Sequence, residues 1–195
     1  MRLFVALDID DAICERLARF VDGVRGFAPD ARWVSAESLH VTLKFIGEKP
    51  ENVVEDVKQA LETVQAGSIE ISFRGYGFFP SAKAPRVFWV AIAAPPSLAA
   101  LASSINESMS PLGIPKEEHA YSPHLTLARG AGGSGSPHRR KGDKPNHSFH
   151  RLQEKLAALP APEFGTMTAR GFFLYRSQLS PKGAKYTKLA RFPLA

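Results

Sequence analysis

Hydrophobic and polar positions along this chain alternate in short blocks that predict strands and helices in mixed order. Apolar runs or period-two alternation predict strands at 2–9, 32–34, 39–46, 69–79, 86–94, 122–129, 164–175 and 185–192. Apolar stripes at helical spacing predict helices after Asp10 or Asp11, after Pro50 and after Pro95-Pro96. A last helical stripe consists of Phe149, Leu152, Leu156 and Leu159. No glycine-rich nucleotide-binding fingerprint is present, and the order favours an α+β fold with helices covering one side of antiparallel sheets.

A four-residue pattern, histidine-apolar-threonine-apolar, occurs twice within predicted strands. It reads His40-Val41-Thr42-Leu43 in the first copy and His124-Leu125-Thr126-Leu127 in the second. Because successive side chains of a strand point to opposite faces, each histidine shares a face with its threonine, and the apolar residues point to a core. Two such strands side by side would present two imidazoles and two hydroxyls to one cavity. That set suits acid and base chemistry at a phosphate.

The spacing of the two motifs extends to neighbouring segments and predicts an internal duplication. The motifs lie 84 residues apart, and the same offset places Arg2-Leu3-Phe4-Val5 on Arg86-Val87-Phe88-Trp89. After the second motif the offset grows to 96, which places Arg74-Gly75-Tyr76 on Arg170-Gly171-Phe172. We therefore expect a single domain over 1–195, with two halves of similar topology at roughly 1–85 and 86–195.

Length and composition are those of a folded protein of one domain. The chain has 195 residues, of which 44% are hydrophobic and 23% are charged. No apolar run approaches the ~20 residues that cross a bilayer, and the short apolar start is soon followed by Asp8, Asp10 and Asp11. The single Cys14 excludes an internal disulfide and a cysteine-based zinc site. These features predict a cytoplasmic protein without a membrane segment, with Cys14 packed on the apolar side of a helix.

The net charge of +6 arises largely from one segment. The segment from Arg129 to Arg151, both included, holds six Lys or Arg residues and a single acid, Asp143. A Gly/Ser-rich insertion at about 130–147 holds most of these charges and accounts for the growth of the offset. A basic loop directly after a candidate phosphate site suggests a polyanionic substrate such as RNA. The alternative is a solvated, flexible insertion whose charge only aids solubility.

The paired histidines, His40 and His124, are the main catalytic candidates. A lone histidine in a strand is usually structural or merely exposed, whereas two with the same neighbours and strand phase indicate function. Metal binding is the chief alternative, but zinc or iron usually takes a third or fourth ligand, and neither motif carries an acid within reach along its strand. We therefore expect no metal and no cofactor. The remaining histidines are expected to be exposed: His119, His138, His147 and His150.

Four further residues are candidates for binding the substrate. Thr42 and Thr126 are expected to donate hydrogen bonds to phosphate oxygens, although threonine is also a good strand former. Arg129, five positions after His124, would face away in a regular strand, but a bulge would turn it in to bind an anion. Phe45, five positions after His40, would stack on a nucleobase or pack in the core. The other aromatic residues of these strands are expected in the core: Tyr76, Phe78, Phe79, Phe88 and Trp89.

These residues suit the hydrolysis of a 2′,3′-cyclic phosphate at an RNA end. Water attacks phosphorus while one ribose oxygen leaves on the opposite side, so one group takes a proton and another gives one. Histidine, with a reference pKa of about 6.5, can do either near neutral pH. The free enzyme must hold one imidazole neutral and one protonated, which predicts a bell-shaped pH profile belonging to the coupled pair. The residues alone do not assign the two roles.

Several of these segments resemble a known family. The motifs within Leu39–Gly47 and Pro123–Arg129, the opening Met1–Leu7, and the ending with Gly183 and Tyr186 are similar to the RNA 2′,3′-cyclic phosphodiesterases. These belong to the two-histidine phosphoesterase superfamily and were formerly named 2′-5′ RNA ligases. The resemblance implies a bilobed α+β fold, with two pseudo-symmetric lobes of antiparallel sheet, helices on the outer faces and the active cleft between the lobes.

The resemblance also implies an activity and a role for each histidine. The implied reaction is hydrolysis of a terminal 2′,3′-cyclic phosphate to a 2′-phosphate, with His40 as proton donor and His124 as proton acceptor. We expect the protein to be a monomer. Members of the wider superfamily cleave other cyclic nucleotides or 2′-5′ oligonucleotides, and a weak reversible 2′-5′ ligation is also implied. A non-catalytic nucleotide-binding module is the alternative from a different class. The insertion after Gly130 departs from the family pattern and leaves the length of the substrate open.

Overall fold

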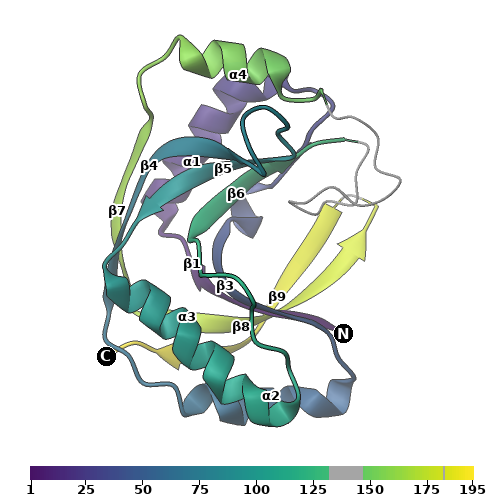
Figure 1. Ribbon diagram of the computed structural model, residues 1–195, viewed down its shortest axis with the longest axis vertical. Coiled ribbons are helices and arrows are strands. Elements are labelled where there is room, and N and C mark those ends of the chain that lie inside the picture. The colour runs from purple at the N-terminus through teal and green to yellow at the C-terminus, as the bar shows by residue number, and fades with distance from the viewer. Residues whose placement is uncertain (132–146, 182) are drawn as a thin grey trace.

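The computed structural model describes residues 1–131, 147–181 and 183–195 (Figure 1). The strands are β1 (Arg2–Asp8), β2 (Arg32–Trp33), β3 (His40–Glu48), β4 (Ile69–Phe79), β5 (Val87–Ala93), β6 (His124–Arg129), β7 (Glu163–Ala169), β8 (Gly171–Ser180) and β9 (Gly183–Pro193). The α-helices are α1 (Asp11–Val24), α2 (Val54–Glu62), α3 (Pro96–Met109) and α4 (His150–Ala157). Short 3-10 turns are η1 (Arg25–Phe27), η2 (Ala36–Ser38), η3 (Glu51–Val53) and η4 (Ser110–Leu112). The predicted basic insertion at about 130–147 lies almost entirely outside the described residues.

Two antiparallel sheets form the two lobes of the molecule. The sheet of the His40 lobe has the strand order β3-β1-β8-β9, and the sheet of the His124 lobe has the order β2-β6-β5-β4-β7. Helix α3 packs against β3 and α2 in the His40 lobe, while α1 packs against β7 in the His124 lobe (Figure 1). Helix α4 lies beside η1, at the far end of the His124 lobe. The predicted α+β fold with helices outside the sheets is confirmed.

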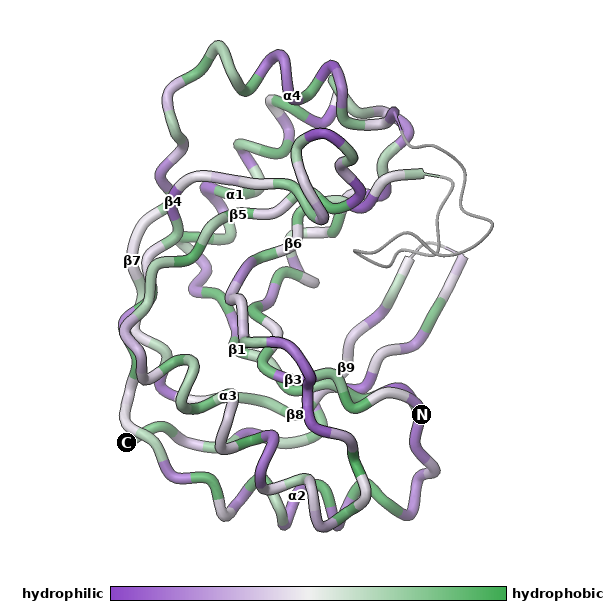
Figure 2. The backbone as a smooth tube through the Cα atoms, in the orientation of Figure 1, coloured by the Kyte–Doolittle hydropathy of each residue, from purple (hydrophilic) through white to green (hydrophobic). Residues whose placement is uncertain are grey.

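The helices follow from their apolar stripes. In α1 the residues at helical spacing, Ile13, Leu17 and Val21, are buried against the sheet, and Cys14 packs partly buried beside them, as predicted. The polar side of each helix faces outward, so that apolar and polar stretches alternate along the backbone (Figure 2). The burial of one stripe therefore holds each helix on its sheet, since short helices gain most of their stability from such packing.

Two predicted element boundaries are wrong. The expected strand at 164–175 is two strands in different sheets, β7 and β8, separated by Arg170. The Arg170 carbonyl accepts hydrogen bonds from the Leu194 amide and the Arg191 guanidinium, both at 3.0 Å, and the chain crosses between the sheets there. Leu159 does not continue the stripe of α4 but is 43% exposed, because the helix ends at Ala157, close before Pro160.

Strands of the two predicted halves are exchanged between the sheets. β1 and β3, from the first half, pair in one sheet with β8 and β9. β4, also from the first half, pairs in the other sheet with β5 and β7. A boundary near residue 85 therefore does not separate the two sheets, and the duplication itself stays a prediction.

The face of the His40-lobe sheet that points away from the main core carries a small cluster of its own. Phe4, Ala6 and Tyr175 are buried there, with Phe173 and Tyr186 packed against them. The alternate residues of β1, such as Val5 and Leu7, belong to the main core. This separate cluster lies beside His40, and the Phe4 ring packs against the imidazole.

Candidate active site

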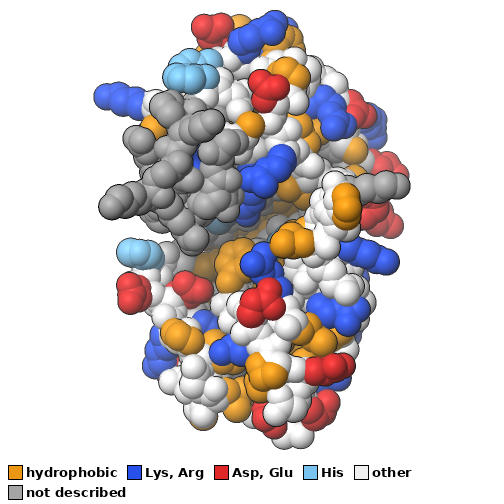
Figure 3. Space-filling view, turned by 90° about the vertical axis from the view of Figure 1, so that its right-hand side faces the viewer, with side chains coloured by type: hydrophobic (Ala, Val, Ile, Leu, Met, Phe, Trp, Pro, Cys, Tyr) orange, Lys and Arg blue, Asp and Glu red, His pale blue; other side chains and the backbone are white. Residues whose placement is uncertain are grey.

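The two motif strands, β3 and β6, lie in contact with each other although they belong to different sheets. In each strand the histidine and threonine are partly exposed, while the apolar residues between and after them are buried. Both copies of the motif therefore turn their polar side chains away from the core, as predicted. Figure 3 shows a hollow on this side of the molecule, with hydrophobic and basic side chains along it.

Each histidine is anchored through the same ring nitrogen. The Nδ1 of His40 lies 2.7 Å from the carbonyl of Ser38, and the Nδ1 of His124 lies 2.8 Å from the carbonyl of Ser122. A carbonyl oxygen only accepts hydrogen bonds, so Nδ1 carries the proton in both rings. This tautomer leaves Nε2 of each imidazole to accept or donate a proton on the substrate side.

A β-bulge follows each motif at the same place. In β3 the pairing moves from Ala6–Thr42 to Val5–Lys44, and in β6 it moves from Trp89–Thr126 to Phe88–Ala128. The extra residue places two successive side chains, Leu43 with Lys44 and Leu127 with Ala128, in buried positions. Strand alternation then resumes with the opposite phase.

The bulges decide where Phe45 and Arg129 lie. Phe45 is 60% exposed, so the alternative that it packs in the core is wrong, and it is free to contact a ligand beside Phe4. Arg129 is partly exposed and acts electrostatically on both His40 and His124. The structure thus places Arg129 near both histidines, and Phe45 lies exposed on the same strand as His40.

Aromatic rings surround both imidazoles, and several of these rings were not predicted as part of the site. Phe4 and Tyr186 pack against His40, with ring centroids at 4.8 Å and 5.2 Å. Phe79 meets His124 edge-on, with a centroid distance of 4.9 Å, and Trp89 lies at 6.3 Å. Phe79 and Trp89 were expected in the core, but strand pairing turns them toward the second histidine. Phe88, in contrast, is buried as expected.

Burial and charge move both histidine pKa values in the same direction. Desolvation lowers the pKa of His40 and of His124 below the ordinary value of 6.5, and the Arg129 guanidinium lowers both further. The carbonyls of Ser38 and Ser122 oppose this by accepting from the rings. Both imidazoles therefore favour the neutral form more than free histidine does.

One carboxylate distinguishes the two histidines. Asp8 lies directly opposite His40 in the β1–β3 pairing, whereas Ala91 holds the corresponding place opposite His124. The Asp8 carboxylate accepts hydrogen bonds from the Tyr175 hydroxyl and the Lys188 ammonium, which fix its position. Asp8 raises the pKa of His40, although the lowering by burial is larger. The two similar motifs thus stand in different electrostatic surroundings.

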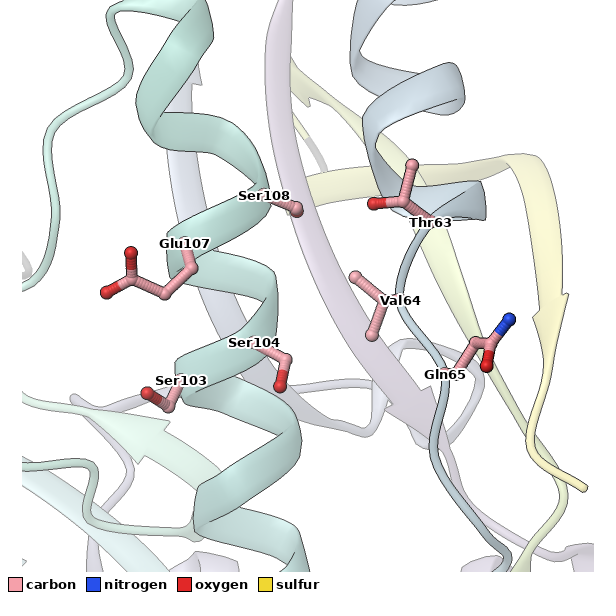
Figure 4. A pocket seen from close by; sticks show the side chains of 7 residues that line it. All are labelled: Thr63, Val64, Gln65, Ser103, Ser104, Glu107 and Ser108. Atoms are coloured by element: carbon pink, nitrogen blue, oxygen red, sulfur yellow. The ribbon is translucent and has the colours of Figure 1, made fainter.

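Other features of the described chain lie apart from this site. A groove of about 590 Å³ runs between the end of α2 and α3 and is lined by Thr63, Val64, Gln65, Ser103, Ser104, Glu107 and Ser108 (Figure 4). His119, His147 and His150 are exposed, as predicted, and His138 lies outside the described residues. Within the described ranges no group of three His, Cys, Asp or Glu residues is arranged to hold a metal ion, and no helix is long and apolar enough to cross a membrane.

Comparison with known proteins agrees with this geometry. The model of the LigT-like phosphoesterase family matches the chain twice, over 7–89 and 90–186, so that each matched segment holds one motif. This chain belongs to the LigT-like phosphoesterase family. Proteins named RNA 2′,3′-cyclic phosphodiesterase from Archaeoglobus fulgidus and Methanothermobacter thermautotrophicus are similar to it. The first is 32% identical over 98% of this chain and 99% of its own length, and the second is 31% identical over 100% and 99%.

Solved structures of the family share the fold. A Thermus thermophilus protein is 28% identical and has a TM-score of 0.76. The match covers 100% of this chain and 98% of that protein. Escherichia coli LigT, solved in complex with 3′-AMP, has a TM-score of 0.75 at 23% identity, with coverage of 99% of this chain and 97% of LigT. The two-sheet, bilobed architecture of this family member is therefore the one found in known LigT-type structures.

Proposed function

We propose that this chain hydrolyses the 2′,3′-cyclic phosphate at an RNA end to a 2′-phosphate, with the paired histidines as acid and base and without a metal or cofactor. The observation that carries the proposal is the matched anchoring of the two imidazoles, each held by a carbonyl at Nδ1 so that Nε2 is available. Full-length relatives named RNA 2′,3′-cyclic phosphodiesterase support the substrate class. Both motifs come from one chain, so a monomer suffices for the site, and a single cysteine suits a reducing cytoplasm.

The proposed reaction is one in-line displacement at phosphorus. Nε2 of His124 takes a proton from water as the water oxygen bonds to phosphorus. The bond from phosphorus to the ribose 3′-oxygen breaks, and Nε2 of His40 gives its proton to that oxygen. The hydroxyls of Thr42 and Thr126 donate to the non-bridging oxygens, and Arg129 balances their charge. The products are a 2′-phosphate and a free 3′-hydroxyl, and the two histidines have exchanged protonation states.

Asp8 supports the assignment of His40 as the proton donor. A donor must be protonated before the reaction, and a carboxylate opposite the imidazole favours its cationic form. His124 faces Ala91 at the corresponding position and gains no such support. Two imidazoles with the same anchoring are thereby biased toward different protonation states, as the chemistry requires.

The Asp8→Asn variant is expected to narrow the pH profile of kcat/KM from its alkaline side. Loss of the carboxylate lowers the pKa of His40, so the donor loses its proton at a lower pH, while the acid limb, set by His124, stays in place. In the wild type the bell should centre below 6.5, because burial and Arg129 lower both histidine pKa values. Asp11→Asn, at an exposed position in the first turn of α1, is the control and should keep the wild-type profile. An unmoved alkaline limb in Asp8→Asn would contradict the assignment.

Phe45→Ala is expected to weaken substrate binding more than turnover. Stacking of a base on an aromatic ring contributes about 1–3 kcal/mol, which corresponds to a rise in KM of roughly 5- to 150-fold at similar kcat. Leu179→Ala is a matched control, because Leu179 is also an exposed hydrophobic residue, 77% exposed near the end of β8. Steady-state kinetics with a nucleoside 2′,3′-cyclic phosphate measure both constants. Equal KM values for the two variants would exclude stacking on Phe45.

A comparison of substrates tests the proposed function itself. An oligonucleotide ending in a 2′,3′-cyclic phosphate should be hydrolysed much faster than a 3′,5′-cyclic nucleotide or a 2′-5′ linked dinucleotide. Preference for the 2′-5′ diester would instead indicate a 2′-5′ oligonucleotide phosphodiesterase. Tight binding of the cyclic phosphate without turnover would indicate a non-catalytic nucleotide-binding module.

A further inference from the structure

Lys44 is a buried cation that the proposed reaction does not use. It is 2% exposed and lies on the side of β3 that faces α3, where the bulge after the motif has turned it. Its ammonium donates hydrogen bonds to Oδ1 of Asn106, at 2.6 Å, and to the carbonyl of Pro115, at 2.8 Å. Burying an ammonium group costs free energy unless its hydrogen bonds are replaced, so the position of Lys44 calls for a structural reason.

The partners of Lys44 lie on α3 and on the connection that leads from α3 to His124. The chain leaves α3, passes through 113–123 and enters β6 at His124. Asn106 also accepts a hydrogen bond from the Glu117 amide, at 3.4 Å, so the same side chain holds both Lys44 and this connection. Further along, the Tyr121 hydroxyl donates to the carbonyl of Thr42, at 3.0 Å. The connection is therefore fastened to β3 at two places just before the Ser122 carbonyl that anchors His124.

The connection that leads to His40 is held in a different way. Its residues Arg32 and Trp33 form β2, which pairs with Arg129 and Ala128 of β6 as part of the sheet. The Val34 amide continues this pairing by donating to the Leu127 carbonyl at 2.8 Å. Backbone hydrogen bonds thus fasten the segment before the first histidine to the strand of the second.

The connection that leads to His124, all of which the structure describes, has no strand that corresponds to β2. The offset of 84 residues between the motifs sets Lys44 where β6 has Ala128. Pro115 has no amide hydrogen to donate to a sheet, and the described connection at 113–121 contains no strand. The hydrogen bond from the Lys44 ammonium to the Pro115 carbonyl links β3 to this connection, where the other half has backbone pairing between β2 and β6.

We propose that Lys44, with Asn106 and Tyr121, is a positioning cluster that fixes His124 relative to His40 by side-chain hydrogen bonds between β3 and the connection at 113–123. The cluster contacts no reacting atom and acts only through the placement of the second histidine. The inference rests on the proposed function for its catalytic consequence, but the fastening of the connection is a separate structural claim. Misplacement of a catalytic group by about 1 Å can cost as much as 10²-fold in rate, so the effect is measurable.

Lys44→Met tests the cluster, since methionine keeps the length of the side chain and removes the charge and the donors. We expect kcat to fall by about 10- to 100-fold with KM changed by less than about threefold. The affinity for a nucleoside–vanadate complex, which resembles the transition state, should fall by the same factor, while that for a nucleoside 2′-phosphate should not. Lys58→Met on α2, whose ammonium lies 3.5 Å from the exposed Glu55, is the matched control and should match wild type.

Tyr121→Phe keeps the inference testable if Lys44→Met does not fold, because it removes only the hydroxyl bonded to Thr42. It should lower kcat by roughly 3- to 10-fold, and hydrogen exchange of the amides at 117–124 should be faster in both variants than in Lys58→Met. The inference would be overturned if a folded Lys44→Met variant kept the kcat and the vanadate affinity of the wild type. If Lys44→Met does not fold, the same result in Tyr121→Phe would overturn it. Faster exchange without any turnover by wild type would uphold the fastening and refute the proposed function instead. Unchanged exchange would refute the fastening.

Discussion

His40→Ala and His124→Ala are each expected to lower kcat by about 10²–10⁴-fold, the usual contribution of one general acid or base. The loss should be similar for both, because the proposed step needs a proton taken and a proton given at once. The two variants should still bind the product 2′-phosphate, since Arg129 and the threonines remain. His150→Ala, at an exposed position on α4, is the matched control and should keep the wild-type rate.

A substrate with a better leaving group separates the two histidines. When sulfur replaces the leaving 3′-oxygen, the leaving group needs no proton, so His40→Ala should recover most of its lost rate. His124→Ala should not recover, since water still has to lose a proton. Recovery by His124→Ala in place of His40→Ala would reverse the assigned roles, and recovery by both would contradict general acid and base catalysis by this pair.

Thr42→Val and Thr126→Val are expected to lower kcat by about 10²–10³-fold each, the loss seen when one donor to a developing charge is removed. Valine has the shape of threonine and is an equally good strand former, so β3 and β6 should fold as before. The substrate's negative charge grows on the non-bridging oxygens in the transition state, and for that reason kcat should fall more than the affinity for substrate.

The serine variants complete this test, because Thr42→Ser and Thr126→Ser keep the hydroxyl and should regain most of the activity. Thr168→Val is a suitable control, since Thr168 lies on β7, an edge strand at the opposite end of the sheet from β2. If either valine variant kept the kcat of the wild type, the threonine at that position would serve only as a strand former and would not bind the phosphate. The sequence leaves that alternative open.

Local periodicity explains why most of the elements and the motif residues could be predicted. The faces of His40 and Thr42 follow from strand alternation alone, and the stripe of α1 follows from helical spacing. The pairing of strands from distant parts of the chain does not follow from local pattern. Sequence alone therefore did not show that Phe4, Tyr175 and Tyr186 lie beside His40 or that Phe79 and Trp89 lie beside His124.

Register explains the remaining differences. The sequence offset matches Phe4 with Phe88, but the observed pairing sets Ala6 opposite Thr42 and Trp89 opposite Thr126. By this register Phe88 corresponds to Val5, one residue away from the sequence match. Phe88 is accordingly buried, while Phe79 and Trp89 lie beside the second histidine. The sequence offers a bulge before Arg129 as one alternative and none before Phe45, whereas the structure has a bulge at the same place in both strands. Asp8, Lys44 and Tyr121 carry no local signal of their roles.

The decisive measurement is the ³¹P NMR time course of an oligonucleotide ending in a 2′,3′-cyclic phosphate, incubated in EDTA with wild type, His40→Ala or His124→Ala. We predict that wild type replaces the cyclic-phosphate resonance by that of a 2′-phosphate, with no 3′-phosphate, and that both variants leave it essentially unchanged. Absence of turnover by wild type in EDTA, with recovery on addition of a divalent metal, would contradict catalysis by the two histidines alone. So would undiminished turnover by either variant.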